Sequence, residues 1–533
     1  MSQNEFNKYG SSDWATWRQL KTAGYCTPSQ NALFLGFHDV RWSSRLFWNS
    51  AAGILICAGP RIGKFKFIGA FNALPGLSQR TQIFHDPKAE WWEIALDQTP
   101  DRRKCAVWSP NKRKGVPQDR INPVCIKADD PKMISRIKKF LASSVTVTGG
   151  NAKFFELSAQ DFGECIAITV TMRDGEFTIP AFYDAINLVL KNTEDAHKFE
   201  WLMQSCPHKH VGAAADIIRY GKNNSSNTFQ SIMAELKNAF SCMSDPFLRA
   251  SVSSPFNMSL EEIVRDGRWN LYLMPDSDFI DTWSPVIRAF YETLRELKEH
   301  NPDAPDQDWW LDECHLLAPF PLVAKMLNFG AGIGIRPIII VQSFEQMDDI
   351  CPNGSTIIPA GCGVQIYFGI REIESAERIS RMLGNQTLRY NDALAQDEAK
   401  LQRRRLFDGL FGRGDPISLG REYSHHKKAS HHRSEIERPL MTASEIMRMT
   451  PGRALMFGDE LPHPVDLQLF AYYERRELAG QFFPHHKHTD DMTKVRVKTR
   501  FGHKLLNVMI GPVPQEFADY PQYADGTWTY IAS

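Results

Sequence analysis

Short apolar runs, bounded by polar, glycine or proline residues, recur in the early and the later parts of the chain. They are ILICA (54–58), TQIFHD (81–86), CAVWS (105–109), WNLYLMP (269–275), DWWLDE (308–313), RPIIIVQ (336–342) and CGVQIYFG (362–369). Segments with helical spacing lie between them, of which TWSPVIRAFYETLRELKEH (282–300) is the longest. Continuously apolar strands that alternate with helices are typical of a parallel sheet covered on both faces. The pattern therefore predicts an α/β fold with a mainly parallel sheet.

Residues 131–250 have a different pattern, because helical stretches follow one another there with almost no strand signal. This predicts an all-helical domain inserted into the α/β core. Its aromatic residues recur at roughly helical spacing and are expected in its interior, at Phe154, Phe155, Phe162 and Trp201. We expect four regions, namely 1–130, the helical insert 131–255, the second half of the core 256–475, and a C-terminal extension 476–533. The basic segment 400–438 is expected to be a loop or flexible insert.

Composition narrows the possible functions. The chain has 533 residues, enough for about two to four domains. Its 62 Lys and Arg residues balance 62 Asp and Glu residues, so overall charge predicts neither a nucleic-acid nor a membrane partner. None of the 10 cysteines is spaced C-x-x-C, which favours reduced thiols over a zinc ribbon. No signal peptide is visible, and no apolar run approaches the ~20 residues of a membrane helix, so we expect a cytoplasmic protein.

The run that ends at Ala58 leads into a segment close to a phosphate-binding loop, AGPRIGKF (58–65). In such a loop, G-x-x-x-x-G-K-[ST], backbone N–H groups surround the phosphates, the lysine reaches the terminal ones and the hydroxyl binds Mg²⁺. Here Ala58 replaces the first glycine and Phe65 replaces the hydroxyl residue. We therefore expect a nucleotide site that is impaired at its metal position. Its binding residues are Ala58, Gly59, Pro60, Arg61, Ile62, Gly63, Lys64 and Phe65.

Two later strands end in polar residues suited to the same site. The run WWLD ends in Asp312 and Glu313, which could position Mg²⁺ and polarise an attacking water. The alternative is that this acidic pair only caps the next helix. The run RPIIIV is followed by Gln342, which could contact the terminal phosphate. Because open α/β sheets bind ligands at the carboxyl ends of their strands, we expect Lys64, the acidic pair and Gln342 to converge.

The motifs occur in an order that resembles a known family. LFLG precedes the loop, and HDPKAEWWEIA (85–95), INP (121–123), LDECHLL, GAGIGIRPIIIVQSFEQMDDI, IYFGIREIESAERISRMLGNQT and RPLMTASEIMRMTPGRALMF follow it. Together they resemble the TraG/TraD-like coupling proteins of type IV secretion and conjugation, over most of the chain. The resemblance implies a RecA-like P-loop ATPase core with an inserted all-helical domain. It also implies a hexameric ring that binds ATP and Mg²⁺ at its subunit interfaces.

The resemblance also implies roles for individual residues. Lys64 matches the Walker A lysine, Asp312 and Glu313 match the Walker B metal ligand and catalytic base, and Gln342 matches the motif glutamine. Arg336 matches an arginine that enters the same strand, and we expect it to be catalytic.

Two positions depart from the family pattern. A proposed trans arginine finger would lie five residues before Arg336, where this chain has Ala331, so such an arginine must come from elsewhere. Phe65 is bulky for the position after the lysine. It either crowds the metal or turns inward as the first core residue of the helix.

Three further segments have two interpretations each. HHKKASHH (425–432) is a metal site or a solvated loop, and RRR (403–405) contacts DNA phosphates or lies on a charged surface loop. After the second strand, Lys88 holds Asp86 near the phosphates, or the segment is a structural turn.

These expectations lead to one main functional hypothesis. The chain would be an ATP-dependent coupling protein that drives single-stranded DNA–relaxase complexes or effector proteins into a type IV secretion channel. Because no membrane anchor is visible, it would dock on inner-membrane components from the cytoplasmic face. Two alternatives remain, a hydrolytically impaired nucleotide-binding receptor and a soluble FtsK/HerA-like DNA translocase.

Overall fold

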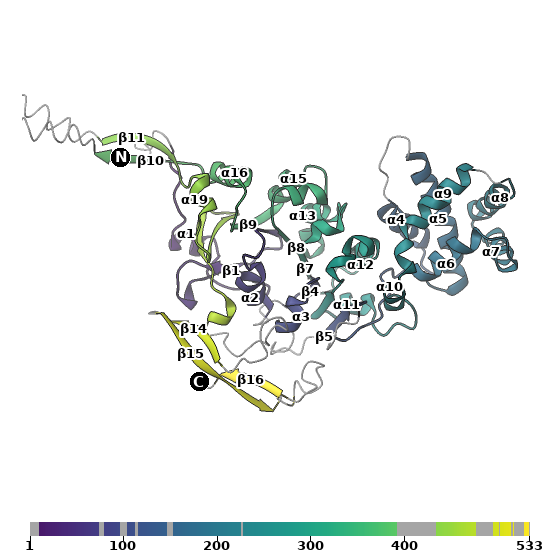
Figure 1. Cartoon of the computed structure of the whole chain (residues 1–533), viewed down its shortest axis with the longest axis horizontal. Coiled ribbons are helices and arrows are strands. Elements are labelled where there is room, and N and C mark those ends of the chain that lie inside the picture. The colour runs from purple at the N-terminus through teal and green to yellow at the C-terminus, as the bar shows by residue number, and fades with distance from the viewer. Residues whose placement is uncertain are drawn as a thin grey trace, which may run out of the picture.

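The computed structural model describes residues 10–73, 79–95, 104–111, 116–145, 153–224, 227–391, 433–475, 494–499, 502–512, 515 and 527–531. Its centre is one sheet of eleven strands in the order β2-β1-β13-β12-β9-β3-β8-β7-β4-β6-β5 (Figure 1). The strands are β1 (Leu33–Phe37), β2 (Arg45–Trp48), β3 (Gly53–Ala58), β4 (Thr81–His85), β5 (Lys104–Trp108), β6 (Trp269–Leu273), β7 (Gln307–Asp312), β8 (Ile335–Val341), β9 (Cys362–Phe368), β12 (Arg453–Gly458) and β13 (Val465–Gln468).

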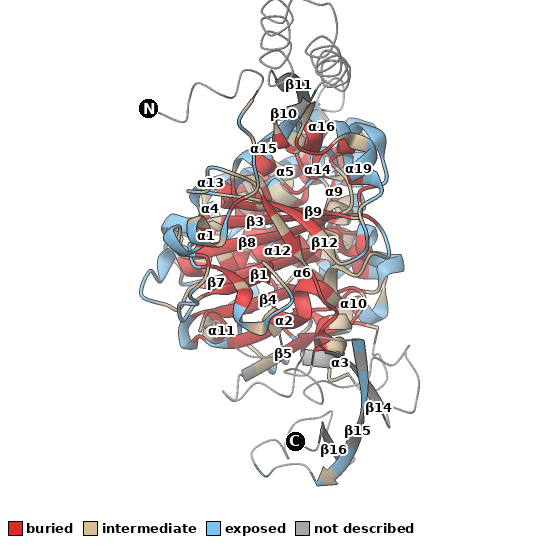
Figure 2. Ribbon diagram, turned by 90° about the vertical axis from the view of Figure 1, so that its left-hand side faces the viewer, coloured by how far each residue is buried: buried red, intermediate tan, exposed pale blue. Residues whose placement is uncertain are grey.

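The seven strands from β9 to β5 run parallel, and β12, β13, β1 and β2 extend the sheet with antiparallel pairs. Every residue of β3, β4, β6, β7 and β8 is buried, which explains why these strands read as continuous apolar runs (Figure 2). The expected α/β fold with a mainly parallel sheet is confirmed.

Two hydrophobic clusters lie on the two faces of the sheet, because successive side chains of a strand point to opposite sides. On one face, Leu55 and its neighbours pack against α11 (Leu260–Asp266), α12 (Ile280–His300) and α13 (Leu322–Ile333). On the other face, Ile54 and its neighbours pack against α1 (Trp17–Thr22), α3 (Glu90–Ala95) and the helix that follows β3. That helix is π-helical over Phe65–Gly69 and continues as α2 (Ala70–Ala73).

A separate helical unit is inserted between β5 and β6 and lies to one side of the sheet (Figure 1). It consists of α4 (Met133–Ser144), α5 (Lys153–Asp174), α6 (Ile179–Val189), α7 (Glu194–Gln204), α8 (Lys209–Asn223), α9 (Asn227–Ala239) and α10 (Pro246–Ser251). The expectation that its aromatic residues are interior is wrong for two of them, since Phe154 is 60% and Trp201 is 64% exposed. Helical spacing alone does not distinguish an inward from an outward face.

The chain enters and leaves the helical unit along paired segments. Ile121 forms a parallel bridge with Met258, and its N–H donates to the carbonyl of Ser251 at 3.1 Å. Asn257 adds a hydrogen bond from its N–H to the carbonyl of Arg120 at 3.2 Å. The insert is therefore closed at its base.

Smaller elements follow the main sheet. After α14 (Glu345–Ile350), α15 (Gly354–Ala360) and α16 (Ile373–Leu383), β10 (Asn385–Asn391) pairs with β11 (Arg433–Pro439), and α19 (Ala443–Met447) follows. The end of the basic segment expected to be a loop is thus a strand, whereas RRR (403–405) and HHKKASHH (425–432) lie outside the described residues. A three-stranded sheet is formed by β14 (Lys494–Thr499), β15 (Gly502–Pro512) and β16 (Thr527–Ile531).

Among the helices that the structure describes, none is both long and apolar enough to span a membrane.

Candidate nucleotide-binding site

The loop after β3 approaches the neighbouring strand β9 very closely. Ala58 is the last residue of β3, pairs with Phe368 and is fully buried. The N–H of Gly59 donates to the carbonyl of Phe368 at 3.3 Å, and a Cβ at this position would lie 2.3 Å from the carbonyl oxygen of Gly369. Only glycine fits there. The close approach thus falls on Gly59, one residue after the position at which the motif expects its first glycine.

The rest of the loop reverses the chain and starts a helix. Arg61 and Gly63 both have positive φ, 58° and 91°, and Pro60 and Arg61 are exposed. Lys64 has helical backbone angles and lies directly before Phe65–Gly69. Backbone N–H groups at the start of a helix attract anions, which suits this loop to a phosphate group.

The ammonium of Lys64 is buried and makes no hydrogen bond to any residue within the described ranges. Burial lowers the pKa of Lys64, while the nearby carboxylates of Asp312 and Glu313 act in the opposite direction. A buried ammonium without a hydrogen-bond acceptor is costly unless a ligand supplies one. The geometry is therefore suited to an anion such as a phosphate.

Asp312 and Glu313 lie at the carboxyl end of β7, two strands from β3. Asp312 is the last residue of the strand, and its Oδ1 accepts no hydrogen bond from the residues placed in the structure. Burial raises the pKa of Asp312 above its usual range. Glu313 adopts a left-handed conformation (φ 52°, ψ 34°) and makes no side-chain capping bond to the turn Cys314–Leu317 that follows. The capping interpretation is thus unsupported for Glu313.

Gln342 follows β8, the strand between β3 and β7. Its Nε2 donates to Oε1 of Glu313 at 3.3 Å, and its backbone N–H donates to Oε1 of Gln346 at 2.7 Å. The same carboxylate oxygen of Glu313 accepts a hydrogen bond from the ammonium of Lys88 in a close ion pair. The structure therefore brings Lys64, the acidic pair and Gln342 to one edge of the sheet.

The segment after β4 contains Asp86 and Lys88, for which the sequence left two interpretations open. The carboxylate of Asp86 accepts hydrogen bonds from the N–H groups of Glu90, Trp91 and Trp92, at 2.9 to 3.1 Å, and so caps α3. Lys88 pairs with Glu313. Asp86 therefore has a structural role in this turn, whereas Lys88 belongs to the cluster around Glu313.

His85, the last residue of β4, contacts the backbone of the acidic pair. It is fully buried, and its Nδ1 lies 2.6 Å from the carbonyl oxygen of Asp312. A carbonyl only accepts, so Nδ1 carries the proton. Burial lowers the pKa of His85 to about 4, which keeps the ring neutral near pH 7. In the sequence, the only feature that could have pointed to His85 was its position at the end of a predicted strand.

Phe65 turns inward. Its ring packs at 4.9 Å, edge to face, against Trp91 and at 6.4 Å against Tyr472. The sequence left open whether Phe65 crowds the metal or packs inward, and the structure shows that it packs inward at the start of the helix. The position still lacks the hydroxyl that a phosphate-binding loop places after its lysine.

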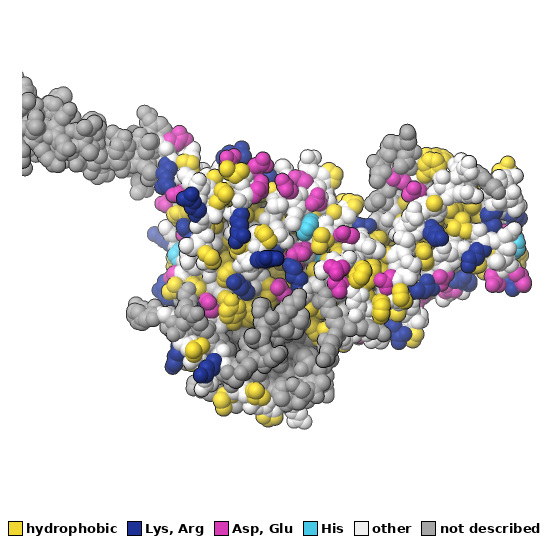
Figure 3. Space-filling model, viewed as in Figure 1, with side chains coloured by type: hydrophobic (Ala, Val, Ile, Leu, Met, Phe, Trp, Pro, Cys, Tyr) yellow, Lys and Arg dark blue, Asp and Glu magenta, His cyan; other side chains and the backbone are white. Residues whose placement is uncertain are grey.

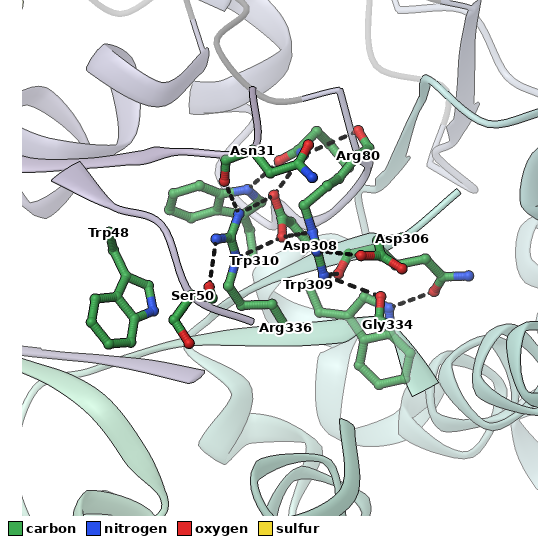
Figure 4. Close-up of polar contacts among 12 residues, drawn as sticks. Asn31, Trp48, Ser50, Arg80, Asp306, Asp308, Trp309, Trp310, Gly334 and Arg336 are labelled. Carbon is green, nitrogen blue, oxygen red and sulfur yellow. Dashed lines mark hydrogen bonds and ion pairs between the residues drawn. The ribbon is translucent and has the colours of Figure 1, made fainter. Parts of the chain in front are cut away.

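Arg336 lies near the opposite end of β8 from Gln342. This position is contrary to the expectation that Arg336 is catalytic. It is the second residue of β8, and its guanidinium donates to Asp308 at 2.8 and 2.9 Å and to the carbonyls of Ser50 and Asn31 (Figure 4). At about 3.3 Å per strand residue, it lies roughly 20 Å from Gln342. Asp308 also pairs with Arg80 at 2.6 Å, and all three side chains are buried. Within one chain, Arg336 is therefore not brought to the cluster.

Comparison with known proteins agrees with this architecture. The family model described as type IV secretory system conjugative DNA transfer matches residues 4–407. The chain belongs to this family.

The chain is similar in sequence to one conjugal transfer protein and similar in fold to solved conjugative coupling proteins. The conjugal transfer protein TraG of Escherichia coli is 22% identical over 275 residues, which cover 49% of this chain and 39% of TraG. The chain thus spans about two fifths of the length of that relative. Solved structures of the bacterial conjugative coupling protein TrwBdeltaN70 (11% identity, TM-score 0.58) and of TrwB in complex with ADP and Mg²⁺ (12%, 0.56) cover 87% of this chain and 94% and 97% of theirs. At this identity the solved structures show the fold alone, with a RecA-like core.

Proposed function

We propose that this chain is an ATP-dependent coupling protein that recruits DNA–protein or protein substrates and drives them into a type IV secretion channel. The observation that carries the proposal is the cluster at the carboxyl ends of β3, β8 and β7. There a buried lysine without a partner among the described residues faces two carboxylates and a glutamine. Phosphoryl transfer depends on such positioning and charge stabilisation.

The residues also fit a Mg²⁺ ion. Asp312 has a buried carboxylate whose Oδ1 has no hydrogen-bond donor among the placed residues, and TrwB has been solved with ADP and Mg²⁺. Asp312 would hold the ion, directly or through water, because the position of Phe65 offers no hydroxyl. A bound Mg²⁺ neutralises phosphate charge.

The chain's own groups divide the work of hydrolysis. Lys64 and the loop N–H groups bind the phosphates, and Gln342 orients the carboxylate of Glu313. Glu313 accepts the proton of a water whose oxygen forms a bond to the γ-phosphorus. The bond from that phosphorus to the bridging oxygen breaks, and ADP leaves with the electron pair. Glu313 then holds the proton, and the products are ADP and inorganic phosphate.

The helical unit is suited to contact with a substrate. Between α4, α5 and α8 lies a groove of about 480 Å³ whose lining includes Ile134, Phe162 and Ile217. The same unit exposes the large side chains of Phe154 and Tyr220, and Figure 3 shows hydrophobic side chains on its surface. Side chains of this kind are available for contact with a substrate.

Membership of the family supports a proposal for the assembly and its location. We propose a homohexamer with nucleotide at each interface, docked on inner-membrane components of the secretion system at the cytoplasmic face. Its substrate would be single-stranded DNA with its relaxase, or an effector protein.

A second function, a nucleotide-binding receptor without hydrolysis, is favoured by Phe65 alone.

An ATPase assay with single-stranded DNA separates the two functions. It compares wild type with Lys64→Ala and uses the neighbouring Lys66→Ala as a control. We expect activity in wild type and Lys66→Ala and its loss in Lys64→Ala. Nucleotide binding with equal background rates in all three proteins would establish the receptor. Equal, negligible nucleotide binding in wild type and Lys64→Ala would overturn both functions.

A further inference from the structure

The carboxylate that the proposed reaction needs as a base is already engaged. Oε1 of Glu313 accepts hydrogen bonds from the ammonium of Lys88 and from Nε2 of Gln342. The side chain of Glu313 is 13% exposed and that of Lys88 is 41% exposed. Two donors on one oxygen, one of them an ammonium, stabilise the charged carboxylate and make it a weaker base towards water. In this arrangement Glu313 is restrained.

The backbone on both sides of Lys88 is held in place. Asp86 anchors α3 through three N–H groups, and the ring of Pro87 fixes the φ of the residue directly before Lys88. Ala89 follows with a positive φ of 61°, is fully buried, and its N–H donates to the carbonyl of Asp86 at 3.2 Å. Such a conformation is strained for alanine and persists only where its surroundings enforce it. Lys88 can therefore change partner only through its flexible four-carbon side chain.

A second partner for Lys88 lies within the same cluster. Its charge acts on Lys64 and Asp312 as well as on Glu313, so two ammonium groups and two carboxylates share one site. The two lysines repel each other until an anion lies between them. A nucleoside triphosphate bound at Lys64 brings such an anion, and its third phosphate carries charge that a diphosphate lacks.

We propose that Lys88 exchanges partners, pairing with Glu313 in the nucleotide-free protein and with the terminal phosphate of a bound triphosphate. The inference rests on the proposed function and deepens it, because the exchange frees Glu313 only when a third phosphate is present. Lys88 acts here as a sensor of the triphosphate, and the exchange itself is non-covalent. The base is thereby released in the state in which it is needed.

The test measures binding, not turnover. Dissociation constants for ADP and for the non-hydrolysable analogue adenylyl imidodiphosphate are determined with Mg²⁺ for wild type, Lys88→Met, Lys88→Arg and the control Lys66→Met. We expect Lys88→Met to weaken binding of the analogue about tenfold and of ADP by less than about twofold, because one charge-assisted hydrogen bond is lost. Lys88→Arg should retain most of the wild-type preference for the analogue over ADP. Equal losses for both nucleotides, or none, would overturn the proposal.

Glu313→Gln provides a test with the opposite sign. Without its resting partner, Lys88 is free, so the analogue should bind several-fold more tightly than in wild type, and this gain should disappear in Lys88→Met/Glu313→Gln. The double variant is also free of the unpaired carboxylate that could destabilise Lys88→Met. A gain that persists in the double variant would contradict the exchange.

The controls separate this inference from the proposed function. If wild type binds nucleotide and Lys64→Ala does not, but Lys88→Met retains the preference for triphosphate, only the role of Lys88 is wrong. If wild type and Lys64→Ala bind equally poorly, the nucleotide site itself is wrong.

Discussion

Phe65 illustrates how one residue can depart from a motif and still have a clear structural role. Its ring fills space against Trp91 and Tyr472 at the start of the helix. The substitution for serine or threonine therefore exchanges a metal contact for a packing contact.

This packing contact should be measurable as stability. We expect Phe65→Ala to lower the free energy of unfolding by about 1–3 kcal/mol, since a half-buried aromatic ring is lost. Phe154→Ala, at a 60% exposed position, is the matched control and should change it by less than ~0.5 kcal/mol. Denaturant unfolding measures both, and equal midpoints would show that the ring at position 65 does not stabilise the core.

His85 predicts a pH dependence of stability. Its pKa is lowered by burial to about 4 in the folded chain, against about 6.5 in the unfolded chain. The stabilisation is therefore complete above pH 6.5 and is lost as the pH falls from 6.5 towards 4, by about 2 kcal/mol at pH 5.

The variant His85→Asn should lack this part of the acid sensitivity. Unfolding free energies at pH 7.5 and pH 5 would be compared for wild type, His85→Asn and the exposed control His197→Asn. A wild-type loss no larger than that of His85→Asn would contradict the assignment.

Arg336 shows where sequence reasoning was weaker than it needed to be. Lys64, Asp312 and Gln342 all lie at the carboxyl ends of strands, and their convergence followed from that fact. Arg336 enters β8 at its amino end, so the same rule would have placed it at the opposite edge. The partnership of Lys88 with Glu313 could not be predicted, because several acidic residues lie within reach of a flexible lysine.

At the scale of elements, the amino ends of β4, β7 and β8 are joined by a buried ionic network. Asp308 binds both Arg80 and Arg336, and Gln82 donates to it at 2.9 Å. Through Asn31 and Ser50, Arg336 ties the segments around β1 and β2 to the parallel sheet. Removing the central carboxylate would leave two buried guanidinium groups without it.

We therefore expect Asp308→Ala to lower the free energy of unfolding by about 3–5 kcal/mol. The partly exposed pair Arg453–Asp466, at 2.6 Å, provides the control. Asp466→Ala should cost no more than about 1 kcal/mol. Thermal or chemical unfolding would reveal the difference, and similar costs would mean that the network is weaker than its burial indicates.

The strands were predictable because continuous apolar runs suit a sheet covered on both faces. The antiparallel order β12-β13-β1-β2 was hidden, because it joins segments far apart in the chain.

At the scale of the whole molecule, the paired segments at Ile121 and Met258 make the helical unit a module with its own base. We expect residues 119–258, expressed alone, to fold into a helical domain with a cooperative thermal transition. Circular dichroism would test this. A disordered fragment would show that the unit depends on contacts such as that of Arg136 in α4 with Glu296 in α12, at 3.1 Å.

The position of β3 between β8 and β9 has a consequence for synthesis on the ribosome. Ile56 can find its partners only after Ile340 and Ile366 have been made. At roughly 5–20 residues per second, that wait is on the order of 15–60 s. Throughout this interval the apolar strand that leads into the phosphate loop is without its sheet, while the helical module can already fold. The nascent chain should therefore depend on holding chaperones at its first hundred residues, long after they have left the exit tunnel.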